Sequence, residues 1–189
     1  MDALAILIAD HNRVRGLFNR FKDAHGADDT AAMGALAMEV VAELEVHTTI
    51  EEEIFYPWSH NLSAEIGETI DEGMEEHHVA KVLMAELSGL DVGAPDWIAK
   101  MKVLMENVEH HADEEEDDLF PPIRSHTKLD DREAVGGRLE ASKAEQGAPV
   151  LADKVDLSDA RLRDLAKEQA IPGRSKMNHE ELAATVSPD

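Results

Sequence analysis

His47-Thr48-Thr49-Ile50-Glu51, which runs on through Glu52-Glu53-Ile54-Phe55-Tyr56-Pro57, is the stretch that decides how this chain folds. A second copy reads His111-Ala112-Asp113-Glu114-Glu115 and continues through Glu116-Asp117-Asp118-Leu119-Phe120-Pro121. In both copies a histidine precedes a glutamate by four residues, and a proline follows that glutamate by six. Residues four apart share one face of a helix. Each copy therefore predicts an imidazole and a carboxylate that point the same way.

Composition favours a helical protein. The 189 residues suit one domain with a small appendage, and only 4% of them are aromatic. The net charge of -23 argues against nucleic acid or an anionic membrane as a partner of the main domain. The chain contains no cysteine, which excludes disulfides and thiolate metal sites. The sequence has no basic leader followed by an apolar run and no apolar span long enough for a membrane, so we expect a cytoplasmic protein.

Four segments carry apolar residues at spacings of three and four, which predicts four helices that each turn one face to a common core. These faces run through Leu4, Leu7, His11, Val14, Phe18 and Phe21; Met33, Leu36, Val40, Leu44, His47, Glu51 and Ile54; Ile66, Ile70, Met74, His77, Ala80, Met84 and Leu87; and Trp97, Met101, Leu104, Val108, His111, Glu115 and Leu119. The connections between them are short. We therefore predict an all-α fold, an up-down-up-down four-helix bundle.

Helix boundaries follow from capping residues and prolines. Asp2 and Ser63 are predicted N-caps of the first and third helices. Pro57 is expected to end or kink the second helix, and Pro121-Pro122 to stop the fourth. Leu129–Glu145 predicts a fifth, solvated helix beyond the bundle.

The bundle reads as an internal duplication. Asp10-His11 and Glu76-His77 hold matching places in the first and third helices, as the two copies of the opening motif do in the second and fourth. The repeat shows which of two adjacent histidines faces the core, because consecutive residues of a helix point in directions about 100° apart. It places His77 and His111 toward the core and the adjacent His78 and His110 away from it.

The inward polar residues indicate a metal site. They are His11, His47, Glu51, His77, His111 and Glu115. A single inward histidine is more often a hydrogen-bonded core residue, and a glutamate run is usually a solvated face. Six such residues at matching depth are different, because an unpaired buried carboxylate costs roughly several kcal/mol. No lysine or arginine lies on these inner faces. A cation is the simplest partner, and imidazole with carboxylate suits iron, manganese or zinc.

Residues 2–145 resemble the hemerythrin-like family, also called the HHE cation-binding domain. The resemblance rests on Asp10-His11, His47-x3-Glu51-Glu52, Glu76-His77 and His110-His111-x3-Glu115 with Leu119-Phe120-Pro121. It implies a bundle that holds two non-haem irons bridged by an oxo or hydroxo group. By position, Glu51 and Glu115 would bridge the irons. His11 and His47 would serve one iron, and His77 and His111 the other.

One position departs from the family members that carry dioxygen. They have a fifth histidine one turn before the third-helix histidine, where this chain has Gly73. The resemblance then leaves coordination positions open to water, to an outside ligand, or to Tyr56, Glu72 or Glu76. Tyr56 is interpreted first as a residue at the end of the bundle. Open positions favour reaction with hydrogen peroxide or nitric oxide, as in an oxidative stress response. The alternative is a dioxygen- or iron-binding sensor or storage protein without turnover, so enzymatic activity stays open.

The C-terminal residues predict a separate unit. Gln146-Gly147-Ala148-Pro149 has the composition of a linker, so we divide the chain into a bundle, 1–146, and a tail, 150–189. The tail resembles the small helix-loop-helix of Rho N-termini and SAP-like modules, from Leu157-Ser158 to Leu182. That resemblance implies nucleic-acid contacts at Arg174 and Lys176. A solubilising or protein-docking appendage is the favoured alternative, and the oligomeric state is left open.

Overall fold

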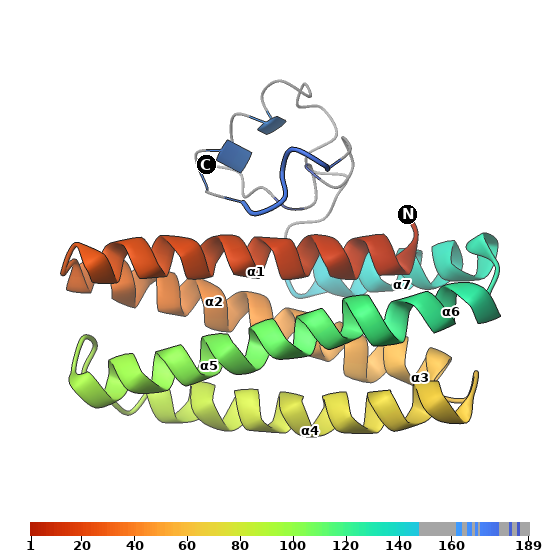
Figure 1. The fold of residues 1–189 in the computed structure, drawn as a ribbon, viewed down its shortest axis with the longest axis horizontal. Helices are drawn as coiled ribbons and strands as arrows, with labels where there is room; N and C mark the ends of the chain where they lie inside the picture. Colours follow the sequence, from red (N-terminus) through yellow and green to blue (C-terminus); the bar gives the residue numbers. More distant parts are fainter. Residues whose placement is uncertain are drawn as a thin grey trace.

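The structure is a computed structural model that describes residues 1–147 and, beyond them, 162–163, 166–167, 169, 171–177, 182 and 185. Within these residues the fold is all helical, as predicted. Four long helices run up and down beside one another (Figure 1): α1 (Ala3–Gly26), α2 (Thr30–Ile50), α4 (Ala64–Leu87) and α5 (Pro95–Glu114). None of the described helices is long and apolar enough to cross a membrane.

Side-chain caps begin three of these helices. The carboxylate of Asp2 accepts a hydrogen bond from the Leu4 backbone N–H at 3.0 Å, and Ser63 Oγ accepts one from Ile66 N–H at 3.2 Å. Both caps are as predicted from the sequence. At α2 the cap is Asp29, whose carboxylate accepts from Ala32 N–H at 3.0 Å. These bonds satisfy N–H groups that would otherwise lack a partner at the helix start.

The second and fourth bundle helices continue through π-helical turns. α2 passes into η1 (Glu51–Phe55) and then α3 (Tyr56–Ser59). α5 passes into η2 (Glu115–Leu119) and then α6 (Phe120–His126). π-Turns inside α-helices are rare and frequently lie at functional sites. Here each one begins at an inward glutamate of the duplicated motif.

The prediction that Pro121-Pro122 stops the fourth helix is therefore wrong. The π-turn closes with a hydrogen bond from Phe120 N–H back to Glu115 O, and Pro121 then stands in the first turn of α6. A proline is tolerated in a first turn, because its missing N–H would have no helical partner there. Pro57 holds the equivalent place in α3.

The π-turn also changes which residues face inward. Phe55 and Tyr56 are buried after Glu51, and the predicted inward residue Ile54 is only partly buried. The wider turn adds a residue, so the inward position moves on by one. On α4, Met74 is 41% exposed and Gly73 is buried instead, which corrects the predicted apolar face there.

Two apolar clusters fill the bundle on either side of the motif residues. One cluster contains Phe18, Phe21 and Trp97, and the other contains Phe55 and Phe120. The inward histidines and glutamates lie between them along all four helices. Apolar packing above and below thus holds the polar layer in place and keeps it from solvent.

The fifth helix, α7 (Leu129–Glu145), has the predicted bounds but is not simply solvated. It packs against α1, α2 and η1, and Val135 and Leu139 join the second apolar cluster. Gly136 meets the N-terminus of α1 so closely that a Cβ there would collide with the Met1 carbonyl oxygen. Arg132 Nε donates to the Asp2 carboxylate at 2.9 Å.

In the described part of the tail, Leu162, Ala166, Ile171, Met177 and Leu182 form a small buried cluster. Ile171 packs against Gly16 of α1, where an added Cβ would meet its Cδ1 atom. Arg174 and Lys176 are exposed. Residues 157 and 158, which carry part of the resemblance to the Rho and SAP-like modules, lie outside the described residues.

Candidate metal centre

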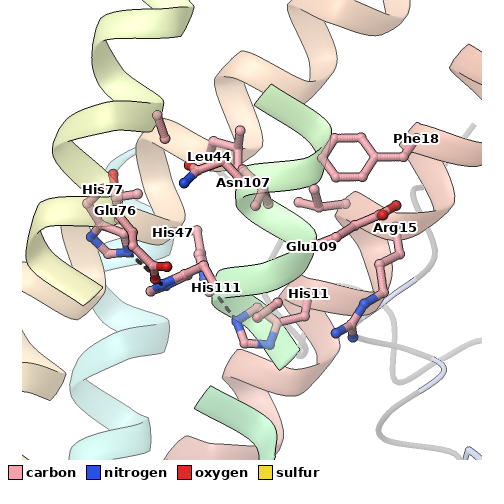
Figure 2. A pocket seen from close by; sticks show the side chains of 15 residues that line it. His11, Arg15, Phe18, Leu44, His47, Glu76, His77, Asn107, Glu109 and His111 are labelled. Atoms are coloured by element: carbon pink, nitrogen blue, oxygen red, sulfur yellow. Dashed lines mark hydrogen bonds and ion pairs between the residues drawn. The ribbon is translucent and has the colours of Figure 1, made fainter. Parts of the chain in front are cut away.

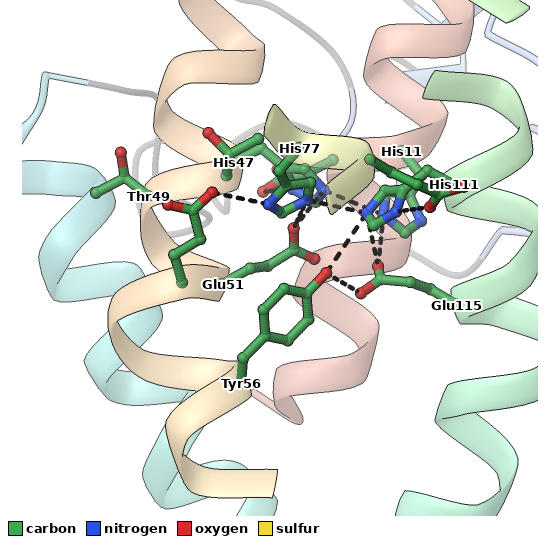
Figure 3. A network of polar contacts seen from close by, with 12 residues as sticks. His11, His47, Thr49, Glu51, Tyr56, His77, His111 and Glu115 are labelled. Carbon is green, nitrogen blue, oxygen red and sulfur yellow. Dashed lines mark hydrogen bonds and ion pairs between the residues drawn. The ribbon is translucent and has the colours of Figure 1, made fainter. Parts of the chain in front are cut away.

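Four helices bring the six motif residues together in one buried layer. They come from α1, α2 with η1, α4, and α5 with η2, and none is more than 6% exposed: His11, His47, Glu51, His77, His111 and Glu115. Figure 3 shows their side chains converging. His78 and His110 are exposed, as the duplication predicted.

The four histidines form two pairs. Nε2 of His11 lies 3.2 Å from Nε2 of His47, and Nε2 of His77 lies 3.0 Å from Nε2 of His111. Each ring turns this nitrogen to the centre and its Nδ1 outward. Each pair thus offers two lone pairs to a common point. The pairing is the one that the family resemblance implied for two separate irons.

The two carboxylates lie between the pairs. Glu51 Oε2 is 3.2 Å from His47 Nε2 and 3.3 Å from His77 Nε2. Glu115 Oε2 is 3.3 Å from His11 Nε2 and 4.0 Å from His111 Nε2. Each carboxylate therefore reaches one histidine from each pair.

These residues fit a bound cation. Among the residues that the structure describes, both oxygens of Glu51, which is fully buried, and Oε2 of Glu115 have no hydrogen-bond partner. A buried polar group without a partner costs about 1–3 kcal/mol, and more when it is charged. Two sets of ligand atoms lie within 4.8 Å of one another: His11, His47, Glu51 and Glu115; and Glu51, His77 and His111. Glu51 belongs to both sets.

Burial and neighbouring charges shift the pKa values of the inward residues. Burial raises the pKa of Glu51, and the charge of Glu115 raises it further. Burial would lower the pKa of His11, but the adjacent carboxylates of Glu115 and Glu116 raise it to about 8. Burial and the neighbouring His111 lower the pKa of His77 to about 2, which leaves that ring neutral and able to bind a metal.

A second layer of carboxylates faces the outer nitrogens of the histidines. Three of them are within hydrogen-bond distance of an Nδ1: Glu116 from His11 at 2.8 Å, Glu52 from His77 at 3.0 Å and Glu76 from His111 at 2.8 Å. The fourth, Asp10, faces His47 across 3.7 Å. Such partners fix the tautomer and orientation of a metal-binding histidine and raise its basicity.

The second layer follows the duplication. On α1 and α4, the acid directly before the inward histidine faces the inward histidine of the next long helix, α2 or α5. The acid directly after each inward glutamate faces the inward histidine of α4 or α1. Two of these acids pair with a cation four residues after a histidine: Glu116 with Arg15 at 2.7 Å and Glu52 with Lys81 at 2.5 Å. Asp10 instead binds Lys143 of α7.

A narrow cavity lies where the histidines meet the apolar cluster that contains Phe18 (Figure 2). All four inward histidines contribute to its wall, together with apolar residues that include Val14, Phe18, Leu44, Ala80 and Val108. Arg15, Asn107 and Glu109 also line it. The cavity offers about 20 Å³ to the centres of water-sized molecules, which is room for about one.

Comparison with known proteins agrees with this geometry. The family model of the hemerythrin HHE cation binding domain matches residues 2–123. The chain belongs to the hemerythrin HHE family. Its fold is thus that of a cation-binding domain, and its buried histidines and glutamates form groups that could hold a metal.

The chain is also similar to several hemerythrin-family and uncharacterised proteins. An uncharacterised protein of Mycobacterium bovis is 29% identical over 79% of this chain and 91% of its own length. An uncharacterised hemerythrin-like protein of Schizosaccharomyces pombe is 23% identical over 72% of this chain and 66% of its own. A DNA nickase of Nostoc is 25% identical over 76% of this chain but only 40% of that longer protein. No solved structure matches.

In this hemerythrin domain, Tyr56 occupies the space that Gly73 leaves. A Cβ on Gly73 would lie 3.2 Å from Tyr56 Oη and 3.3 Å from His111 Cε1. The tyrosine is buried, donates to Glu115 Oε1 at 2.8 Å and lies 3.5 Å from His111 Nε2. Tyr56 is thus part of the site and not only a residue at the end of the bundle.

The other two residues that the sequence offered for the open coordination positions lie elsewhere. Glu72 is exposed, and Glu76 belongs to the outer layer as the partner of His111. Sequence reasoning missed that layer, although its signal was present: an acid precedes His11 and His77, and an acid follows Glu51 and Glu115. It also missed Lys143, although its spacing of four residues from Leu139 and eight from Val135 places it on the apolar face of α7.

Proposed function

We propose that the hemerythrin domain holds two non-haem irons, bridged by an oxo or hydroxo group, and consumes hydrogen peroxide or a related small oxidant such as nitric oxide. The observation that carries the proposal is Glu51, a fully buried carboxylate without a hydrogen-bond partner that lies between two histidine pairs. In this proposal Glu51 and Glu115 bridge the metals. His11 and His47 bind one of them, and His77 and His111 bind the other.

The ligand set supports iron. Imidazole and carboxylate without thiolate suit iron and manganese, and zinc sites also use them. The outer carboxylates orient the imidazoles of the three histidines they touch and raise their basicity. Bound iron would supply Lewis acidity and a redox couple at that layer.

The cavity supports a small, uncharged ligand. Its mostly apolar surface and its size, room for about one water molecule, favour a small uncharged ligand over a bulky one. Hydrogen peroxide fits this description, as do nitric oxide and dioxygen. Disproportionation of peroxide to water and dioxygen needs no other oxidant or reductant, because one peroxide is oxidised while another is reduced.

Tyr56 provides a proton beside the metal layer. Burial raises the pKa of its phenol, and the nearby charges of Glu115 and Glu51 raise it further, so the hydroxyl stays protonated. It donates its hydrogen bond to Glu115. The phenol thereby orients one proposed bridging carboxylate and stands next to the space beside Gly73.

The alternative is a dioxygen- or iron-binding protein that senses or stores without turnover. The same cavity accommodates dioxygen, so binding of a small molecule does not distinguish this alternative from the enzymatic proposal. Consumption of peroxide distinguishes them.

The test uses the full chain loaded with iron(II) in air-free buffer. We expect peroxide to disappear catalytically, with about one dioxygen evolved for every two peroxides consumed. His78→Ala is the matched control, because His78 is exposed and adjacent to His77. It should retain wild-type turnover per iron. Full iron loading without peroxide turnover would contradict the enzymatic proposal and leave the binding alternative.

A further inference from the structure

One of the four outer carboxylates does not bond to its histidine. Asp10 Oδ2 and His47 Nδ1 are both buried, face each other across 3.7 Å and have no hydrogen-bond partner in the described part of the chain. This distance is too long for a hydrogen bond. The other three histidines have an outer carboxylate oxygen within 3.0 Å of Nδ1.

The first cause is the length of the side chain. Asp10 holds the place on α1 that Glu76 holds on α4, each directly before an inward histidine. Glu76 reaches His111 Nδ1 at 2.8 Å. Aspartate is one methylene shorter, and the gap to His47 remains open.

The second cause is a lysine from outside the four-helix bundle. Lys143 lies on the inward face of α7, in line with Val135 and Leu139, and its side chain is only 6% exposed. Its ammonium binds Asp10 Oδ1. By contrast, the lysine that pairs with Glu52 is 45% exposed. α7 begins after the last residue matched by the family model.

We propose that the two metal positions are inequivalent, and that the position served by His11 and His47 holds its metal more weakly. Lys143 is the positioning residue, because it holds the short carboxylate of Asp10 away from His47. The inference rests on the proposed two-metal site. A histidine whose outer nitrogen lacks a partner is less firmly oriented and a weaker donor, and losing such a partner typically costs about 10–100-fold in metal affinity.

The test is a titration of metal-free protein with iron(II) in air-free buffer against a competing chelator. The wild type should bind in two steps whose affinities differ by about 10–100-fold. Asp10→Glu should raise the weaker affinity by about tenfold, because the longer side chain can reach both Lys143 and His47. Glu76→Asp, the reciprocal change, should weaken the other position.

Lys143→Met should also strengthen the weaker position, since it frees Asp10 to bond to His47. Arg132→Met is the matched control: Arg132 is the other buried cation of α7, and it pairs with Asp2 far from the metal layer. It should lower the melting temperature while leaving both affinities unchanged. If Lys143 only holds α7 against the bundle, Lys143→Met should behave as Arg132→Met does, with a lower melting temperature and unchanged metal affinities.

A spectroscopic readout separates orientation from stability. In cobalt(II)-loaded protein, the four bound imidazoles give shifted N–H proton signals, and the one without a partner should exchange fastest with solvent. Asp10→Glu should slow that exchange.

Two equal affinities in the wild type, or a weaker second step in Lys143→Met, would overturn the inference while leaving a two-iron site intact. Fewer than two irons per chain at saturation would instead contradict the proposed function. If Asp10→Glu does not fold, the comparison of Lys143→Met with Arg132→Met decides the matter alone.

Discussion

The half of the site around His11 and His47 differs from the half around His77 and His111. Both halves have two inward nitrogens about 3 Å apart and share the carboxylates of Glu51 and Glu115. The first half is completed by α7, whose buried lysine binds the outer carboxylate. The second is completed inside the bundle, by a glutamate that reaches its histidine directly and by a tyrosine beside a glycine.

The comparison of the two halves shows which residues make the duplicated site asymmetric. The repeated spacing determines which residues point inward, and it does so twice. Residues that differ between the halves would then make the two proposed metal positions unlike: Lys143 lies outside the repeat, and Tyr56 and Gly73 stand where the other half has Phe120 and Leu7. Changes to the shared carboxylates should therefore affect both halves, and changes to Lys143, Tyr56 or Gly73 only one.

The largest effect is expected from Glu51→Leu, which should abolish metal binding in both halves of the site. Glu51 touches a histidine of each pair, so both positions should lose metal. The metal-free variant should nevertheless be more stable than metal-free wild type by about 1–3 kcal/mol, because an unpartnered buried carboxylate is gone. Metal analysis and thermal unfolding check both parts. A variant that retains two irons would show that Glu51 does not bridge.

For each iron removed, the wild type should lose about 3–4 kcal/mol of stability relative to protein at 100–1,000 times the dissociation constant of that iron. For a bundle of this size that corresponds to roughly 6–15 °C in melting temperature. Adding iron back should restore the loss. The measurement is calorimetry with and without iron(II). Equal melting temperatures would mean that no cation compensates the buried carboxylates.

Gly73→His should disturb only the second half. Its Cβ would press on Tyr56 Oη and His111 Cε1, and such overpacking costs about 1–3 kcal/mol. Tyr56→Phe removes one of these contacts, so the double variant should be more stable than the sum of the single changes by about 0.5 kcal/mol or more. Denaturant unfolding of the four proteins in the cycle measures this coupling. Strict additivity would show that Tyr56 does not occupy that space.

The smallest effect is expected at α7. Gly136→Ala should destabilise the docked helix by about 1 kcal/mol, because the added methyl meets the Met1 backbone. Gly137→Ala is the adjacent control, where nothing lies within 4 Å of the new methyl. It should stabilise the protein by up to about 1 kcal/mol through helix propensity. Thermal unfolding of both variants provides the check, and identical shifts would argue against the close contact between α7 and α1.

Helical periodicity was sufficient to predict the bundle and to bring the six inward residues to one layer. It failed where the helix is not regular. The turn that begins at Glu51 adds a residue, so Phe55 and Tyr56 are buried where Ile54 was expected. It failed again at Pro121, which is a stop signal in a regular helix but is accommodated in the first turn after a π-turn.

Other features depend on contacts between distant residues. Arg132 and Lys143 lie on the same helical face as Val135 and Leu139, but this thin apolar face does not show where α7 docks, and only the docking buries the two cations. The position of Tyr56 beside Gly73 depends on the π-turn and on the packing of α4 against α3. Sequence spacing within one helix contains none of this information.

The central claim, that this hemerythrin domain holds two irons between Glu51 and Glu115, is tested most directly by the iron content and near-ultraviolet spectrum of the saturated wild-type protein. We predict about two irons per chain and the near-ultraviolet absorption of an oxo-bridged diferric pair after exposure to air. Two irons without that absorption would indicate a hydroxo bridge, and one iron per chain would contradict the claim.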